Sequence, residues 1–103
     1  MVKLENIFAT PMPEEGKEII KEVMSSPHTR VEIIASGEND SLGEWYDQDE
    51  NELVMVVTGS SKLRFGDGSV LEMRRGDYIN IPAHLKHRVE RTKETLWLAI
   101  FYK

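Results

Sequence analysis

Two residues able to bind a metal ion or to transfer protons lie in separate, well-marked segments of the chain. Glu52 directly precedes the apolar run 53–57, and His87 follows a proline turn at Pro82. A carboxylate in such a position can serve as a metal ligand or as a general base. A neutral imidazole can bind a metal through one ring nitrogen while a hydrogen bond fixes the other. If the fold brings the two side chains together, they predict a site for a metal ion or for acid–base chemistry.

Each of these residues also has a structural explanation. Three of the five residues before Glu52 are acidic, so Glu52 could be one more exposed carboxylate of an acidic loop. His87 could be a half-buried histidine that is hydrogen-bonded within its turn. His84 lies in the same turn, where an exposed polar side chain needs no functional role, although it could line the mouth of a cavity. The residue types alone leave both interpretations open.

Tyr46 and Gln48 are the next candidates, because residues two apart share one face of a regular strand. The amide oxygen of Gln48 can coordinate a hard cation, more weakly than an imidazole nitrogen can. The phenol of Tyr46 can orient a substrate, donate a proton or coordinate as a phenolate. The alternative is that Tyr46 packs against its neighbours and Gln48 satisfies backbone groups of its loop.

The spacing of these residues resembles the two sequence motifs of the cupin superfamily. Glu52 and Gly59 match the Glu-x6-Gly end of the first motif. Gly76, Pro82 and His87 match the Gly-x5-Pro-x4-His pattern of the second. The resemblance implies a small antiparallel β-barrel, the double-stranded β-helix or jelly roll, with Glu52 and His87 at two of the family's usual metal-ligand positions. It also implies many roles, from dioxygenases, isomerases, epimerases and decarboxylases to storage and sensing proteins, so the fold alone identifies no reaction.

The first motif departs from the family pattern, because its usual His-x-His pair is missing. The family's shorter spacing places Tyr46 and Gln48 in those two positions, and the longer spacing places Trp45 and Asp47 there. The resemblance therefore implies a reduced metal site, made by Gln48 together with the glutamate and histidine of the two motifs. Such a site would hold one divalent ion (Mn, Fe, Ni or Zn) weakly, since an amide and a phenol replace two imidazoles and metals such as zinc and nickel favour nitrogen ligands. The alternative is a barrel that binds no metal.

The segments that must position these side chains have the pattern of β-strands. Residues 29–35 alternate between apolar and more polar side chains, which predicts a strand with one wetter face. Residues 53–57 form a continuous apolar run, consistent with a strand buried on both faces, and Gly59 begins a turn. Further strands are expected at 62–65, 70–73, 78–82 and 95–102. Turn residues every eight to twelve or so positions predict an all-β sandwich or barrel of about eight short strands.

The same patterns predict the core and the domain boundaries. The expected interior consists of alternate residues on three strands: Leu53, Met55, Val57, Leu63, Phe65, Ile79 and Ile81. Lys62 and Arg64 are expected to face water. Within residues 14–24 the apolar positions 19, 20, 23 and 24 favour one or two helical turns. We therefore expect a single domain, 1–103, with a barrel core at about 29–102 and an N-terminal arm at 1–28.

The composition limits the possible partners. A chain of 103 residues forms one domain, and its net charge of −5 argues against nucleic acid as the main partner. The chain has no cysteine, its start lacks the apolar region of a signal peptide, and no stretch reaches the roughly 20 apolar residues of a membrane span. We therefore expect a cytoplasmic protein that does not associate with membranes. The last strand, 95–102, is apolar on both faces, which predicts a homodimer in which a second copy covers the outer face.

The sequence supports two main functional hypotheses. The first is an enzyme, such as a dioxygenase or isomerase, that uses a weakly held divalent metal on a small polar molecule. Its metal ligands would be Gln48, Glu52 and His87, and its catalytic groups Tyr46 and Glu52. The second is a metal-independent barrel that binds or senses a small ligand, such as a sugar or an acid, without catalysis. A barrel whose site has decayed is a third possibility.

Overall fold

The computed structural model describes residues 1–40 and 43–103 and consists almost entirely of antiparallel strands. A short 3-10 turn, η1 (Ile7–Ala9), precedes six strands: β1 (Glu18–Ser26), β2 (Thr29–Ser36), β3 (Asn51–Phe65), β4 (Val70–Arg74), β5 (Tyr78–Ile81) and β6 (His87–Tyr102). Within the described residues, no helix is long and apolar enough to cross a membrane. The all-β architecture expected from the sequence is confirmed.

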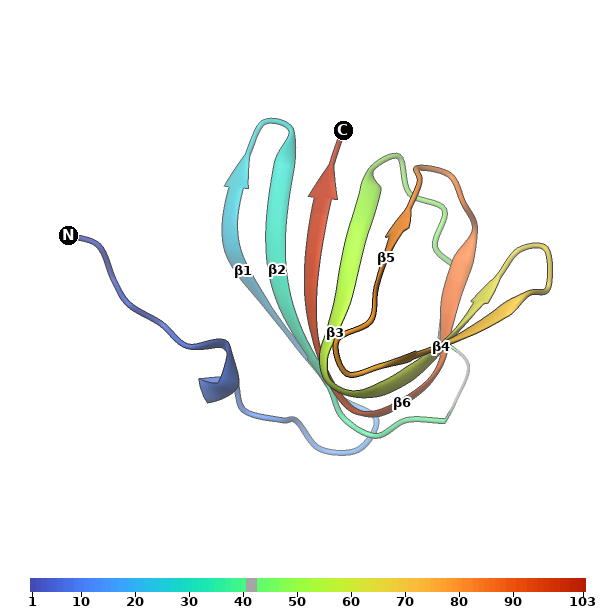
Figure 1. Ribbon diagram of the computed structural model, residues 1–103, viewed down its shortest axis with the longest axis horizontal. Coiled ribbons are helices and arrows are strands. Elements are labelled where there is room, and N and C mark those ends of the chain that lie inside the picture. The colour runs from blue at the N-terminus through green and yellow to red at the C-terminus, as the bar shows by residue number, and fades with distance from the viewer. Residues whose placement is uncertain (41–42) are drawn as a thin grey trace.

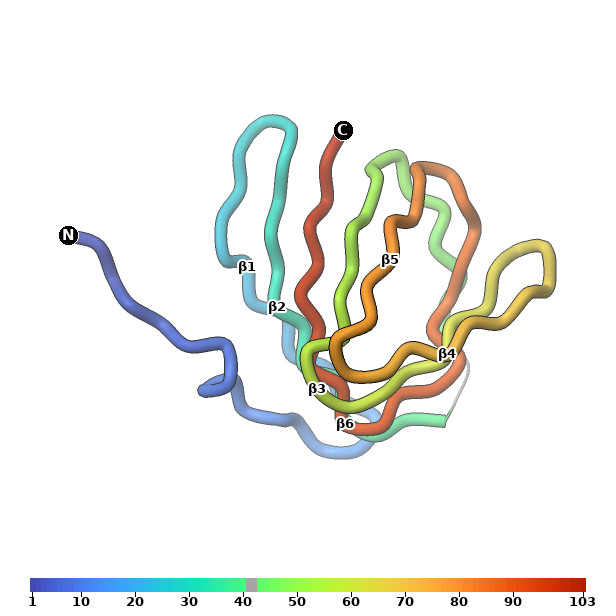
Figure 2. The backbone as a smooth tube through the Cα atoms, in the orientation of Figure 1, coloured from blue at the N-terminus to red at the C-terminus, as the bar shows by residue number. Residues whose placement is uncertain are grey.

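The two longest strands, β3 and β6, form the frame of the barrel (Figure 1, Figure 2). They pair with each other along most of their length, and each contributes to two walls. The first wall has the strand order β1, β2, C-terminal half of β6, N-terminal half of β3, β5. In the second wall, β4 pairs with the C-terminal half of β3. The N-terminal half of β6 forms isolated bridges with Asn39 and with Tyr46. The space between the walls is the interior of the barrel.

Gly59 marks the place where β3 bends from one wall into the other. The sequence predicted a turn there and two separate strands, but β3 continues through it with register shifts between Val56 and Thr58 and between Thr58 and Ser60. Gly59 has a φ of 84°, in the left-handed region that glycine adopts readily. A β-bulge of this kind bends a strand without ending it. Two of the expected short strands are therefore one long strand.

In the N-terminal half of β3 the apolar side chains that face inward are Val54 and Val56, which are 4% and 0% exposed. The prediction that Leu53, Met55 and Val57 fill the interior was wrong, because these three are only partly buried. Side chains alternate along a strand, and an inward Glu52 places residues 54 and 56 on the same side. The rest of the predicted interior is confirmed: Leu63 and Ile81 are buried in the core, with Phe65 and Ile79 packed against it. Lys62 and Arg64 alternate with Leu63 and are partly exposed.

The helical turns predicted within residues 14–24 were also wrong, because this segment contains β1. β1 pairs with β2, with a register irregularity between Glu22 and Met24 that leaves Val23 as an extra residue. This irregularity accounts for the adjacent apolar residues at 23 and 24, which together with the apolar pair at 19–20 resemble a helical pattern. The first wall therefore begins at Glu18, before the expected start of the barrel core at about residue 29.

Candidate functional site

A cavity of about 490 Å³ lies between the two walls of the barrel. This volume is in the range of sites that bind small molecules. Its polar lining residues include Glu18, Arg30, Glu32, Tyr46, Gln48, Glu52 and His87. Its apolar lining includes Ile20, Ile34, Val54, Leu63, Trp97 and Phe101. All four candidate residues of the sequence analysis thus line one cavity.

Glu52 and His87 approach each other inside this cavity. The Nε2 atom of His87 lies 3.7 Å from Oε1 of Glu52, and the two side chains are 6% and 12% exposed. The Nδ1 atom of His87 is 2.8 Å from the carbonyl oxygen of Leu85. Since a carbonyl oxygen only accepts hydrogen bonds, Nδ1 carries a proton and donates it to Leu85. The other ring nitrogen, Nε2, is therefore the one presented to Glu52 and to the cavity.

Gln48 and Tyr46 complete this group. The amide nitrogen of Gln48 donates to Oε1 of Glu52 at 3.1 Å. The ring of Tyr46 lies 5.7 Å from the ring of His87, and the ring of Phe65 lies 6.4 Å from it. The backbones of Tyr46 and His87 also pair, with N–H···O distances of 2.7 and 3.1 Å. The structure therefore brings together the four residues that the sequence analysis selected.

The segment that carries Tyr46 is held in place by Trp45. Two cations of this chain lie close to the Trp45 ring, with Arg88 at 4.6 Å and Lys86 at 5.1 Å from its centre. Such cation–π contacts fix an aromatic ring without burying it. Because Trp45 faces the outside, the next residue along the strand-like segment faces the cavity.

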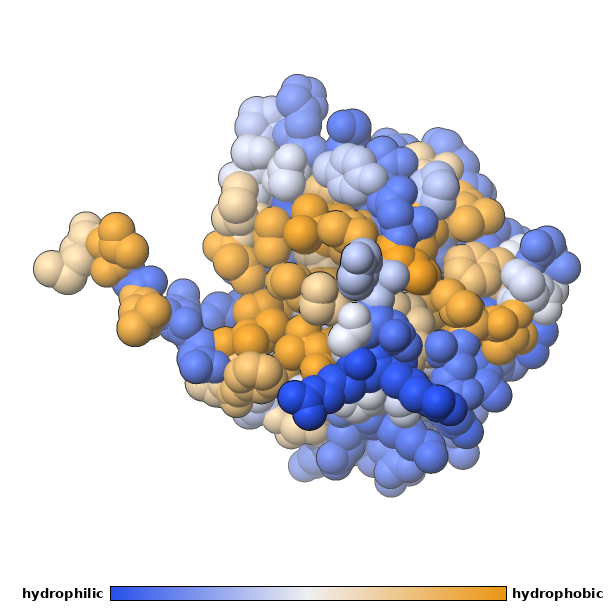
Figure 3. All heavy atoms as spheres, in the orientation of Figure 1, coloured by the Kyte–Doolittle hydropathy of each residue, from blue (hydrophilic) through white to orange (hydrophobic). Residues whose placement is uncertain are grey.

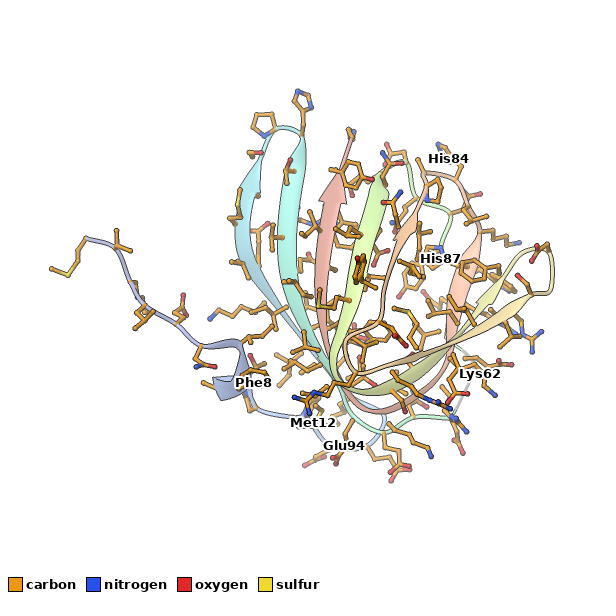
Figure 4. All side chains as sticks on the ribbon, in the orientation of Figure 1. Phe8, Met12, Lys62, His84, His87 and Glu94 are labelled. Carbon is orange, nitrogen blue, oxygen red and sulfur yellow. The ribbon has the colours of Figure 1, made fainter. Side chains whose placement is uncertain are left out.

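His84 lies at the rim of the barrel, whereas His87 lies inside (Figure 4). Its Nδ1 atom is 3.0 Å from Asp47, and its side chain is 68% exposed. The backbone N–H of His84 donates to the carbonyl oxygen of Gln48 at 2.8 Å. His84 therefore ties two rim loops together and does not belong to the Glu52–His87 group.

Two ionisable groups of the site have shifted pKa values. Burial by itself disfavours the imidazolium of His87, but the hydrogen bond and charge of Glu52, with the Leu85 carbonyl, outweigh burial and raise its pKa. Burial, together with the carboxylates of Glu18, Glu44 and Glu52, raises the pKa of Tyr46. The phenol is thus a proton donor at neutral pH, and a phenolate ligand at this position is disfavoured.

Arg30 and Glu32 are cavity residues that the sequence analysis did not single out. The guanidinium of Arg30 is 3.0 Å from Glu32 through Nε and 3.0 Å from Glu50 through Nη1. It also lies 4.2 Å from the centre of the Phe101 ring. The alternation of residues 29–35 is the sequence pattern that could have identified these two residues, because the wetter face of that strand is the face that lines the cavity.

Gln48, Glu52 and His87, as they are arranged in the structure, do not fit a resident divalent metal. Within residues 1–40 and 43–103, no three His, Cys, Asp or Glu side chains are grouped so that they could hold a metal ion. Gln48 directs its amide N–H, not its oxygen, toward Glu52. The raised pKa of His87 works against metal binding, because a metal has to compete with a proton for Nε2. Glu52 and His87 remain as two donors, where a zinc site usually has three or four protein ligands.

The raised pKa of His87 predicts how stability changes with pH. The interaction of protonated His87 with Glu52 contributes fully to the stability of the fold below the ordinary histidine pKa of about 6.5. This contribution is lost as pH rises through the pKa of His87 in the folded state. In Glu52→Gln, burial remains while the carboxylate is gone, so the pKa of His87 should fall below its ordinary value. An NMR titration of the imidazole signals, assigned by their loss in His87→Ala, measures both values. An unchanged pKa in Glu52→Gln would show that Glu52 does not control His87.

Comparison with known proteins agrees with this geometry. The family model described as cupin domain matches residues 30–101. A solved structure from Ralstonia eutropha, which carries the provisional name mannose-6-phosphate isomerase, is 36% identical over 99% of both chains, with a TM-score of 0.87. A Streptococcus pyogenes protein of unknown function is 13% identical over 100% of this chain and 89% of its own, with a TM-score of 0.84.

A third solved structure, a cupin 2 conserved barrel domain protein from Leptotrichia buccalis, is 24% identical, with a TM-score of 0.78. The match covers 90% of this chain and 44% of the Leptotrichia chain. Comparison with curated proteins gives no match. The two motifs around Glu52 and His87, the barrel that joins them and the family match over most of the chain lead to one conclusion: the chain belongs to the cupin superfamily.

Proposed function

We propose that this barrel binds a small, uncharged, polyhydroxylated molecule, such as a sugar, in its cavity without requiring a metal. The observation that carries the proposal is the buried Glu52–His87 pair, which faces a cavity of about 490 Å³. Glu52 supplies hydrogen-bond acceptors, and Nε2 of His87 accepts a hydrogen bond when the ring is neutral and donates one when it is protonated. A ligand hydroxyl can use both, because it donates one hydrogen bond and accepts others.

The walls of the cavity suit the ring of a sugar. Trp97 and Phe101 provide apolar surface on one side, while Gln48 and Tyr46 provide polar groups near the Glu52–His87 pair. Small-molecule sites typically combine such an apolar lining with a few placed polar groups. The name of the Ralstonia relative supports sugars as the class of ligand to test first.

The charges of the cavity favour a neutral ligand over a phosphorylated one. The carboxylates of Glu18, Glu32 and Glu52 line it, against the permanent cations of Lys17 and Arg30. Arg30 is already bound by two carboxylates, Glu32 and Glu50. Phosphate is bound in proteins by arginines that present a free fork of donors. A phosphate group would have to displace these carboxylates, whereas a hydroxyl would not.

A second candidate function is proton transfer on the bound molecule, such as an isomerisation. The observation in its favour is a buried acid–base pair, 3.7 Å apart, with a phenol that stays protonated beside it. In this case Glu52 would accept a proton and Tyr46 would donate one. The absence of cysteine favours a reducing compartment, the cytoplasm, as the place of either function.

Binding measurements on protein purified without a metal-affinity tag and treated with EDTA test this proposal. We expect neutral hexoses and polyols to raise the melting temperature, because a ligand that binds only the folded state stabilises it. Mannose and mannose 6-phosphate form a matched pair, and the phosphate should bind no better than the neutral sugar. Titration with Mn, Fe(II), Ni and Zn tests the alternative of a weakly held metal. Sugar binding that requires one of these ions would contradict the proposal and favour a metal-dependent enzyme.

A further inference from the structure

The cavity contains a second group of charged side chains besides Glu52 and His87. Arg30 and Glu32 of β2 both line it. Nε of Arg30 donates to Oε2 of Glu32 at 3.0 Å, and Nη1 donates to the two carboxylate oxygens of Glu50 at 3.0 and 3.2 Å. The guanidinium also lies 4.2 Å from the centre of the Phe101 ring. Arg30 is therefore fixed by three neighbours, and it fixes the carboxylate of Glu32 in turn.

Each of these two cavity carboxylates keeps one oxygen free for a ligand. Arg30 binds Oε2 of Glu32, and Gln48 binds Oε1 of Glu52. Among the residues that the structure describes, none donates a hydrogen bond to Oε1 of Glu32 or to Oε2 of Glu52. Neither oxygen is sealed from solvent, because the one buried side-chain atom without a partner in the same residues is Nε of Arg88. A molecule in the cavity can therefore reach both oxygens.

The register of the first wall separates these two carboxylates by one strand. Phe101 of β6 pairs with Glu52 on one side and with Arg30 on the other, so the three side chains share the inner face. The two pairs together place the backbones of Glu52 and Arg30 about 10 Å apart. Glu32 lies on the same face about 7 Å further along β2, and so about 12 Å from Glu52. The end of β6 and the starts of β2 and β3 lie at one rim of the barrel, where hydrophilic side chains gather (Figure 1, Figure 3).

We propose that Arg30 and Glu32 bind the end of the ligand opposite the end bound by Glu52 and His87, and so select ligands by the spacing of their hydroxyls. This inference rests on the proposed function and concerns the same cavity. Oε1 of Glu32 accepts a hydrogen bond from a ligand hydroxyl, and Nη2 of Arg30, which has no partner among the described residues, donates one.

The distance between the two carboxylates sets which hydroxyls can be bound together. Side chains on one face of a sheet stand roughly parallel, so the carboxylates keep about the separation of their backbones. Hydrogen bonds of about 2.7 Å at each end then leave about 6 to 7 Å between the two ligand oxygens. Hydroxyls at opposite ends of a hexose meet this requirement, whereas two hydroxyls on neighbouring carbons do not.

Glu50 provides the matched control, because Arg30 could also serve only to tie β2 to the segment before β3. Glu50 binds the same arginine as Glu32 and is similarly buried, with 21% and 17% of the two side chains exposed. Glu50 is not one of the described residues that line the cavity. In calorimetric titrations of the full chain with mannose in EDTA, Glu32→Gln should weaken binding by about 10-fold or more, as for a lost hydrogen bond to a charged group. Glu50→Gln should keep most of the affinity. Equal losses in both variants, or no loss in Glu32→Gln, would overturn the inference.

Analogues of mannose that each lack one hydroxyl identify the hydroxyl that each carboxylate binds. One analogue should bind the parent protein about 10-fold more weakly than mannose does, yet show little further loss in Glu32→Gln, because the variant has already lost that contact. A different analogue, lacking a hydroxyl that is not adjacent to the first, should behave in this way with Glu52→Gln. If both variants respond to the same or to neighbouring hydroxyls, the second binding point is refuted while the proposed function stands. A parent protein that binds no neutral sugar would contradict the proposed function, and this inference with it.

Discussion

Gly59→Ala should destabilise the barrel by about 4 kcal/mol or more, which is enough to unfold many domains of this size. A Cβ atom at this position would lie 2.4 Å from the carbonyl oxygen of Glu94 and 2.6 Å from that of Lys93. Both are backbone atoms of β6, so neither can move without disturbing the pairing of the two longest strands. The φ of 84° adds the cost of a left-handed conformation.

Gly68→Ala is the matched control for this prediction. Gly68 has a φ of 89°, but a Cβ atom there would meet no atom within 4 Å. It should therefore cost only about 1 kcal/mol, from the left-handed conformation alone. Urea unfolding followed by circular dichroism gives both values as shifts in the midpoint. Equal losses in the two variants would mean that the bend of β3 does not depend on close approach to β6.

His87→Ala should weaken binding of the neutral sugar by about 100-fold, because it removes a buried hydrogen-bonding group of the site and leaves Glu52 with Gln48 alone beside it. His84→Ala should leave most of the affinity, since His84 contacts Asp47 at the rim. Glu52→Gln keeps the shape of the site and should also weaken binding strongly. Calorimetry at pH 6.5 in the presence of EDTA measures all three variants against the parent protein.

The outcome of these substitutions separates the possible sites. Circular dichroism first establishes that His87→Ala folds, since the histidine packs against Phe65 and its loss leaves a void. Equal losses in His84→Ala and His87→Ala would move the site to the rim. Unchanged binding in Glu52→Gln would show that the ligand does not use the pair.

The sequence allowed the position of the candidate site to be predicted, because its residues belong to spaced motifs. Glu52 and His87 are 35 positions apart in the chain and lie in opposite walls, where Glu52 pairs with Phe101 and His87 pairs with Phe65. They approach to 3.7 Å because β3 bends at Gly59 from one wall into the other, so that the two walls face each other across the cavity. Tyr46 followed from the same motif and pairs with His87 through its backbone. The function of these residues does not follow from their position, because the same barrel supports many chemistries.

Other features could not be predicted, because a sequence pattern does not state which side of a strand is inside. The run 53–57 is apolar throughout, so only the inward direction of Glu52 fixes Val54 and Val56 as the core residues. In β2 the alternation identifies the polar face that carries Arg30 and Glu32, but it does not state that this face lines the cavity. Because of the irregularity at Val23, the apolar residues of β1 have a helix-like spacing, and the strand was not predicted.

The central claim, that the cavity beside Glu52 and His87 binds a small neutral molecule, is tested most directly by mapping where that molecule binds. Titration of isotopically labelled protein with mannose in EDTA, followed by two-dimensional NMR, reports each residue separately. We expect the largest shifts at Gln48, at the imidazole of His87 and at the indole of Trp97, with little change on the outer face at Ile33 and Leu98. Shifts confined to the outer face or the rim, or shifts that require an added metal ion, would contradict this account.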